Sequence, residues 1–156
     1  MTQIIMSNVD VYAAIADEAF VDMEKQLIEG REPRSDGKGW ILSFDPSQKG
    51  FKSALVCITF SALWLEATLH LHIADQYGKS QSKEADRKSY EEKLKILGIR
   101  DEELSCALAA FRDLRRTIIH EKAFFDQNEF RFAQDEARKV RQLMQRVQEK
   151  LAEMGC

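Results

Sequence analysis

The chain is poor in residues that break or cross-link structure. Its 156 residues include only two prolines, seven glycines and three cysteines. A composition with so little proline and glycine excludes a collagen-like or low-complexity chain. Cys57, Cys106 and Cys156 form no CxxC pair and no metal-ligand spacing, which excludes a disulfide scaffold. A sparse, odd set of thiols is typical of a reduced, cytoplasmic protein, and we expect that localisation.

Targeting and membrane signals are also lacking. The first ten residues, MTQIIMSNVD, contain no basic region followed by a long apolar run, so no signal peptide is expected. The most apolar stretch, ALVCITFSALWL over residues 54–65, is shorter than a membrane span and is followed directly by Glu66. We interpret it as a buried helix and expect no membrane partner.

Charge of one sign is not in large excess. The formal net charge is −3, with 44% apolar and 31% charged residues. The protein as a whole is therefore not a polycation, and nucleic-acid binding would need a local basic patch. The length suits one domain of ordinary size, which we place over residues 1–156.

Helical periodicity dominates what is present. Apolar residues recur every three to four positions and predict helices over about 8–29, 48–77, a shorter one around 90–97, 101–118, and from about 126 or 128 to 154. No convincing strand emerges. The segment 31–50 is predicted to be a long loop pinned to the body by Trp40, Ile41, Leu42 and Phe44, and 78–89 a polar connection. The predicted fold is all-α, an antiparallel four-helix bundle with one additional short helix.

Several helix ends carry local signals. Ser7 or Asn8 can cap the first helix, and Gly30 can end it. Asp101 is placed to cap the helix that begins near residue 102, where two glutamates follow at its positive end.

The sequence FRDLRRTIIHEK, residues 111–122, places basic residues beside an apolar stripe near the end of that helix. Arg115 flanks the stripe, and His120 follows at a point where the helix can end. An arginine can hold a phosphate through two parallel hydrogen bonds, and a histidine can move a proton near neutral pH. The alternative is structural: the arginines form salt bridges with Asp113 and Glu121, and the histidine caps the helix dipole.

The stretch LRRTIIHEK, residues 114–122, resembles the signature of the HEPN superfamily, the higher eukaryote and prokaryote nucleotide-binding helical domains. The mark of that family is an arginine, four to six residues and then a histidine, near the end of a bundle helix. Arg115, RTII and His120 fit it. Many members carry Asn, Asp or His directly after the arginine, whereas this chain has Arg116, which can instead add to phosphate binding.

The resemblance implies a metal-independent endoribonuclease without a cofactor, a hydrolase of RNA. Its 2′-hydroxyl-attack reaction leaves a 2′,3′-cyclic phosphate and a 5′-hydroxyl. Carried over, His120 would be the general acid/base and Arg115 would stabilise the transition state. The resemblance further implies a homodimer through the motif-bearing helices and a toxin or defence role, with a cognate antitoxin as a partner. Its alternative is a catalytically inactive HEPN-like binding or interaction module.

Charged residues elsewhere leave alternatives open. Glu66 lies in an apolar helix and could orient Arg115 or His120, or simply pair with His70 or Arg112. We therefore name Arg116, Glu66 and Arg112 as possible supporting residues. His70 and His72 point away from a common face of a helix, and no metal site is predicted. The last helix has an excess of basic residues that could guide RNA, or could be a solvated outer face.

Overall fold

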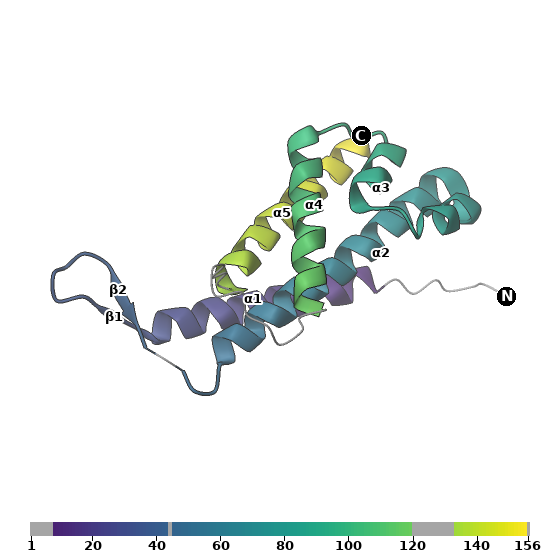
Figure 1. Cartoon of the computed structure of the whole chain (residues 1–156). Helices are drawn as coiled ribbons and strands as arrows, with labels where there is room; N and C mark the ends of the chain where they lie inside the picture. Colours follow the sequence, from purple (N-terminus) through teal and green to yellow (C-terminus); the bar gives the residue numbers. More distant parts are fainter. Residues whose placement is uncertain (1–7, 44, 120–132, 156) are drawn as a thin grey trace.

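The protein is mostly helical, as the computed structural model in Figure 1 shows. The structure describes residues 8–43, 45–119 and 133–155. The described elements are, in chain order, α1 (Val9–Glu29), β1 (Arg31–Pro33), β2 (Trp40–Leu42), α2 (Lys49–Ala85), α3 (Tyr90–Ile96), α4 (Glu102–Ile119) and α5 (Ala133–Met154). The predicted all-α class holds apart from the two short strands.

Helices α1 and α2 form the most extensive helix pair and lie side by side in Figure 1. The buried side of α1 consists of Ala16, Ala19 and Met23, at the helical spacing that the sequence predicted. The helix ends at Gly30, as predicted, and the Gly30 N–H donates to the carbonyl of Gln26. Asn8 precedes α1 without a side-chain capping hydrogen bond, and Ser7 lies outside the described residues.

A β-hairpin occupies part of the segment that was predicted to be a loop. Strands β1 and β2 pair antiparallel, and the hairpin projects beyond the end of α1 (Figure 1). Gly37 and Gly39 between the strands have φ values of 68° and 102°, which reverse the chain at no steric cost. The strands form because the chain reverses at the glycines and the two backbone segments pair. Apolar periodicity reveals neither feature, so the sequence did not predict the strands.

The sequence predicted that apolar side chains of this segment pack against the helices. For Trp40 and Ile41 this prediction is wrong. Trp40 is 53% exposed and Ile41 57% exposed. The Arg31 guanidinium covers the Trp40 ring at 4.2 Å from its centroid, so the ring packs within the hairpin. The Leu42 side chain and Phe44 lie outside the described residues.

Helix α2 continues beyond residue 77, where the sequence predicted its end. Gly78 has φ 86° and ψ 168°, a conformation restricted to glycine, and it divides α2 into a long first part and a short last part. The last part, which was predicted as a polar connection, is helical because Ser82 and Ala85 are buried on one side of it. Figure 1 shows this end of α2 beside α3.

The apolar stretch of α2 forms the centre of the core. Leu65, Leu69 and Ile73 are fully buried. By length and composition α2 could cross a membrane, but half of its most apolar window is buried in protein, and core helices of soluble proteins meet the same criterion.

Helices α4 and α5 complete the described core. Leu104, Leu108, Phe111 and Leu114 are buried on α4, as its predicted stripe required. On α5 the residues Ala137, Val140, Met144, Val147 and Leu151 are buried, at helical spacing. The Leu104 N–H donates to Asp101 Oδ1 at 2.9 Å, which confirms the predicted cap. The predicted start of the last helix, near residue 126 or 128, lies outside the described residues.

Candidate functional site

The short helix α3 is fixed at its start by its own sequence. The Ser89 hydroxyl accepts from the Glu92 N–H at 3.3 Å, and the Glu92 carboxylate accepts from the Ser89 N–H at 2.7 Å. This capping box satisfies two backbone donors and lowers the pKa of Glu92, chiefly through the bond from the Ser89 backbone. The first turns of α3 therefore present side chains towards α2 and α4 from a defined position.

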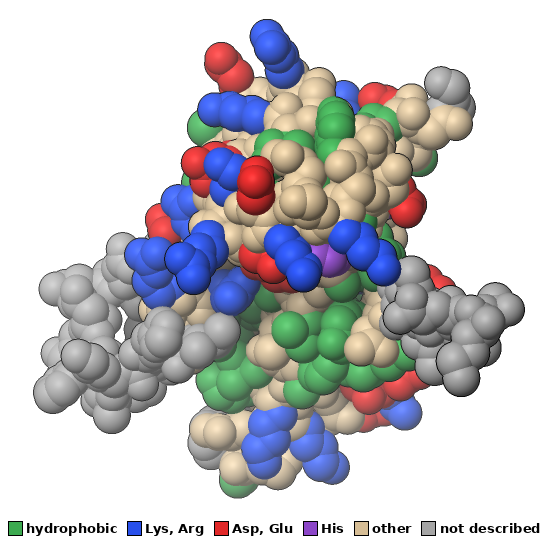
Figure 2. All heavy atoms as spheres, turned by 90° about the vertical axis from the view of Figure 1, so that its right-hand side faces the viewer, with side chains coloured by type: hydrophobic (Ala, Val, Ile, Leu, Met, Phe, Trp, Pro, Cys, Tyr) green, Lys and Arg blue, Asp and Glu red, His purple; other side chains and the backbone are tan. Residues whose placement is uncertain are grey.

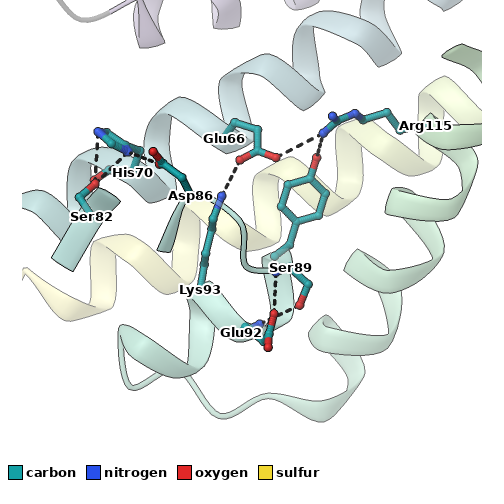
Figure 3. Close-up of polar contacts among 9 residues, drawn as sticks. Glu66, His70, Ser82, Asp86, Ser89, Glu92, Lys93 and Arg115 are labelled. Atoms are coloured by element: carbon teal, nitrogen blue, oxygen red, sulfur yellow. Dashed lines mark hydrogen bonds and ion pairs between the residues drawn. The ribbon is translucent and has the colours of Figure 1, made fainter. Parts of the chain in front are cut away.

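Glu66 of α2 joins α3 to α4 through one carboxylate (Figure 3). Its Oε2 accepts from Lys93 Nζ at 2.6 Å, and its Oε1 accepts from Arg115 Nη1 at 3.3 Å. The Lys93 side chain is only 4% exposed, whereas Glu66 and Arg115 are 40% and 37% exposed. The sequence offered Arg115, His120, His70 and Arg112 as partners of Glu66. Among the described residues, Glu66 contacts Arg115 and contacts neither His70 nor Arg112.

Tyr90 of α3 adds a second contact to the same arginine nitrogen. Arg115 Nη1 donates to the Tyr90 hydroxyl at 2.5 Å. The Tyr90 ring is buried and stacks on Phe111 with the ring centroids 6.1 Å apart. Burial, and secondarily the negative charge of Glu66, raises the pKa of Tyr90. Burial alone would lower the pKa of Arg115, but its contacts with Tyr90 and Glu66 outweigh this and raise it.

The described contacts of the Arg115 guanidinium leave one of its edges unused. Its contacts within the described part of the chain all use Nη1. The Nε and Nη2 groups form the other donor pair of the planar fork, which matches the spacing of two phosphate oxygens. A half-exposed arginine anchored through one nitrogen can therefore bind an anion without first breaking both of its protein contacts.

The other predicted site residues are distributed differently. Arg112 Nη1 donates to both carboxylate oxygens of Glu91, at 2.9 and 3.2 Å, so it belongs to a separate ion pair beside the Arg115 cluster. Arg116 is exposed. His120, the proposed acid/base, lies outside the described residues. In the described structure Arg115 therefore contacts Glu66, whereas Arg112 pairs with Glu91.

Sequence reasoning missed Tyr90 and Lys93. A signal existed, because Lys93 is three residues after Tyr90 and four before Leu97, on the apolar side of a short amphipathic helix. A lysine at such a position is buried, and a buried lysine needs a carboxylate partner.

A second polar cluster lies one helical turn along α2. His70 Nδ1 is 3.2 Å from Asp86 Oδ1 and 2.8 Å from Ser82 Oγ (Figure 3). Although Ser, His and Asp can form a nucleophilic triad, Ser82 is 1% exposed and also donates to the His70 carbonyl. These contacts hold the last part of α2 against the first.

No metal centre is evident among the described residues. They contain no group of three or more His, Cys, Asp or Glu side chains that could hold an ion. His72 Nδ1 lies 2.9 Å from the Thr68 carbonyl, within its own helix. Of the cysteines, Cys57 is buried, which raises its pKa, and Cys106 is exposed.

Basic residues of α5 are matched by carboxylates. Ion pairs join Arg138 to Glu24, Lys139 to Glu136, Arg141 to Asp17, Arg146 to Glu103 and Lys150 to Asp101. Within the described part of this helix, the basic excess noted in the sequence is thus balanced by acidic residues of α1, α4, the segment before α4 and α5 itself. This arrangement favours a solvated outer face over an RNA track.

The surface carries a charged band and, elsewhere, a groove. Figure 2 shows a band of Lys and Arg side chains across one face, with acidic side chains and a histidine among them, above a hydrophobic area. An open groove of about 600 Å³ runs between α1 and α5, with Phe20, Glu24, Arg138 and Arg141 in its lining. The Arg115 cluster does not line this groove, so the groove and the candidate site are separate.

Comparison with known proteins adds no relative. No protein-family model matches the chain, and neither the curated proteins nor the solved structures contain a significant match.

Proposed function

We propose that the protein is a HEPN-like, metal-independent endoribonuclease in which Arg115 binds the scissile phosphate of RNA. The observation that carries the proposal is the anchoring of the Arg115 guanidinium. Nη1 is held by Glu66 and Tyr90 at a partly exposed position, and none of the described contacts uses the Nε–Nη2 edge, which would bind two phosphate oxygens. The Arg115-to-His120 spacing supplies the second half of the argument from the sequence.

The proposed reaction is a transesterification. The RNA 2′-oxygen forms a bond to the adjacent phosphorus as its proton is removed, and the bond from phosphorus to the 5′-oxygen breaks as that oxygen gains a proton. His120 would carry out proton transfer, which is suited to an imidazole near neutral pH. Arg115 would stabilise the additional negative charge on the phosphate oxygens in the transition state.

The proposal includes the finer architecture and the partners. The helices would form an antiparallel four-helix bundle with α3 as the additional short helix. Two copies would meet through the motif-bearing α4 helices, so that two shallow half-sites make one cleft. A toxin or defence role in the cytoplasm, with a cognate antitoxin as partner, would be consistent with this arrangement.

A second candidate is a catalytically inactive HEPN-like interaction module. The ion pairs along α5 favour it, because the described basic residues there already have carboxylate partners and offer RNA little uncompensated charge. In this alternative the contacts of Arg115 with Glu66 and Tyr90 serve only to join α2, α3 and α4.

Cleavage of a mixed RNA pool in EDTA tests the proposal. Wild type should cut the RNA and leave 2′,3′-cyclic phosphate ends, and His120→Ala and Arg115→Ala should each lose about a hundredfold or more in rate. Arg138→Ala, on the ion-paired face of α5, is the matched control and should cut like wild type. Circular dichroism establishes that each variant is folded. No cutting by wild type, or equal cutting by wild type and folded His120→Ala that points to a contaminating nuclease, would instead support the interaction module.

A further inference from the structure

Lys93 occupies an unusual position for a lysine. Its side chain is 4% exposed and contacts Glu66, and the next residue along α3, Leu94, is fully buried. Lysine is almost never fully buried unless it is paired, because its ammonium loses its hydration. An apolar residue would fill the same space without this cost, so the charge calls for an explanation beyond packing.

The contact geometry indicates what the charge does. Lys93 binds one oxygen of the Glu66 carboxylate and Arg115 binds the other. A half-exposed glutamate with one partner can rotate among several side-chain conformations. The buried ammonium of Lys93 restricts that rotation and leaves the second oxygen, Oε1, for Arg115.

Tyr90 restricts the same guanidinium independently. Its hydroxyl accepts from Arg115 Nη1, and its ring is held by burial and by stacking on Phe111. Because Tyr90 and Lys93 are one turn apart on α3, and α3 begins with a rigid capping box, the two constraints share one support.

We propose that α3 is a positioning element for the RNA-binding arginine, in which Lys93, acting through Glu66, and Tyr90, acting directly, fix the Arg115 guanidinium with its Nε–Nη2 edge left for a phosphate. This inference rests on the proposed function. Lys93 and Tyr90 are positioning residues that do not contact the RNA. Orienting a charged group in advance accelerates a reaction because no reorganisation is needed when charge develops.

The test uses the full chain with Lys93→Met and Tyr90→Phe. Two controls repeat the same chemical changes elsewhere: Lys95→Met at an exposed position of α3, and Tyr12→Phe on α1. The first readout is the rotation of the Arg115 guanidinium about its Cζ–Nε bond, measured by side-chain NMR and assigned with Arg115→Lys. The second is kcat and KM for RNA cleavage in EDTA.

We expect faster guanidinium rotation and a kcat about tenfold lower in both test variants, with KM little changed, because misplacement affects the transition state most. The controls should match wild type in both readouts. If Lys93→Met does not fold, Tyr90→Phe still tests the inference, since it removes one oxygen and keeps the ring.

Wild-type rotation in Tyr90→Phe and in folded Lys93→Met would overturn the positioning role. A lower kcat with unchanged rotation would also overturn it, because the effect would then not act through Arg115. Wild-type protein that cuts no RNA would overturn the proposed function, whereas the rotation measurement would still decide whether α3 holds the guanidinium.

Discussion

Helices α4 and α5 both bear arginines paired with carboxylates, but the two sets have different surroundings. On α5, Arg138 Nε lies 2.7 Å from Glu24, closer than Arg115 lies to Glu66 at 3.3 Å. The two arginines are similarly exposed, at 45% for Arg138 and 37% for Arg115, and what separates the sets is the third member beside Arg115, Lys93 of α3, which is 4% exposed. Exposed pairs contribute little, while a buried charge depends on its partner. Ion-pair distance alone therefore does not distinguish a candidate site from a solvated surface.

The largest expected effect comes from removing the shared carboxylate. Glu66→Gln leaves Lys93 buried without a negative partner, and we expect the free energy of unfolding to fall by about 2 kcal/mol, below the usual cost of breaking a fully buried pair because Glu66 is half-exposed. Urea denaturation followed by circular dichroism measures the change.

Glu24→Gln is the matched control for that measurement. It removes the carboxylate partner of Arg138 on the α1–α5 surface, where we expect a loss of at most about 0.5 kcal/mol. Equal losses in the two variants would contradict the distinction drawn from burial.

A smaller effect should appear in alkaline solution. Burial raises the pKa of Tyr90 in the folded protein above the ordinary tyrosine value of about 10, so its contribution to stability is complete below about pH 10. As the pH rises further, the unfolded chain loses the phenol proton first, and stability falls through the folded pKa by at most about 1.4 kcal/mol per pH unit.

Tyr90→Phe should make this alkaline decline shallower, as measured by the urea midpoint at a series of pH values. Tyr77→Phe, which removes a phenol from an exposed position, is the control. An identical decline in wild type and Tyr90→Phe would show that Tyr90 does not contribute to it.

The smallest effect concerns salt. Ions screen exposed charges more strongly than buried ones, so about 1 M NaCl should abolish the small loss in Glu24→Gln and leave most of the loss in Glu66→Gln. Repeating the urea measurements at low and high salt tests this. A loss in Glu66→Gln that disappears with salt would mean that the α4 set behaves like the exposed α5 set.

Prediction from the sequence succeeded where the signal was local. Gly30 and Asp101 mark helix ends because capping involves neighbouring residues. The buried stripe of α4 follows from helical periodicity. The hairpin and the exposed Trp40 were missed because the apolar ring packs against Arg31 within the hairpin, and composition cannot distinguish this from packing on a core.

For the candidate site, the sequence supplied Arg115 and Glu66, and the tertiary structure added Tyr90, Lys93 and the contacts among the four. The sequence alone determined the helical class, the apolar faces and the Arg115-to-His120 spacing, since these depend on the order of nearby residues. Only the tertiary structure decided that Glu66 would meet Lys93 and Arg115, which lie 27 and 49 residues away along the chain. Such distant pairings depend on how helices pack, and a helical period specifies which face is buried but not which helix covers it.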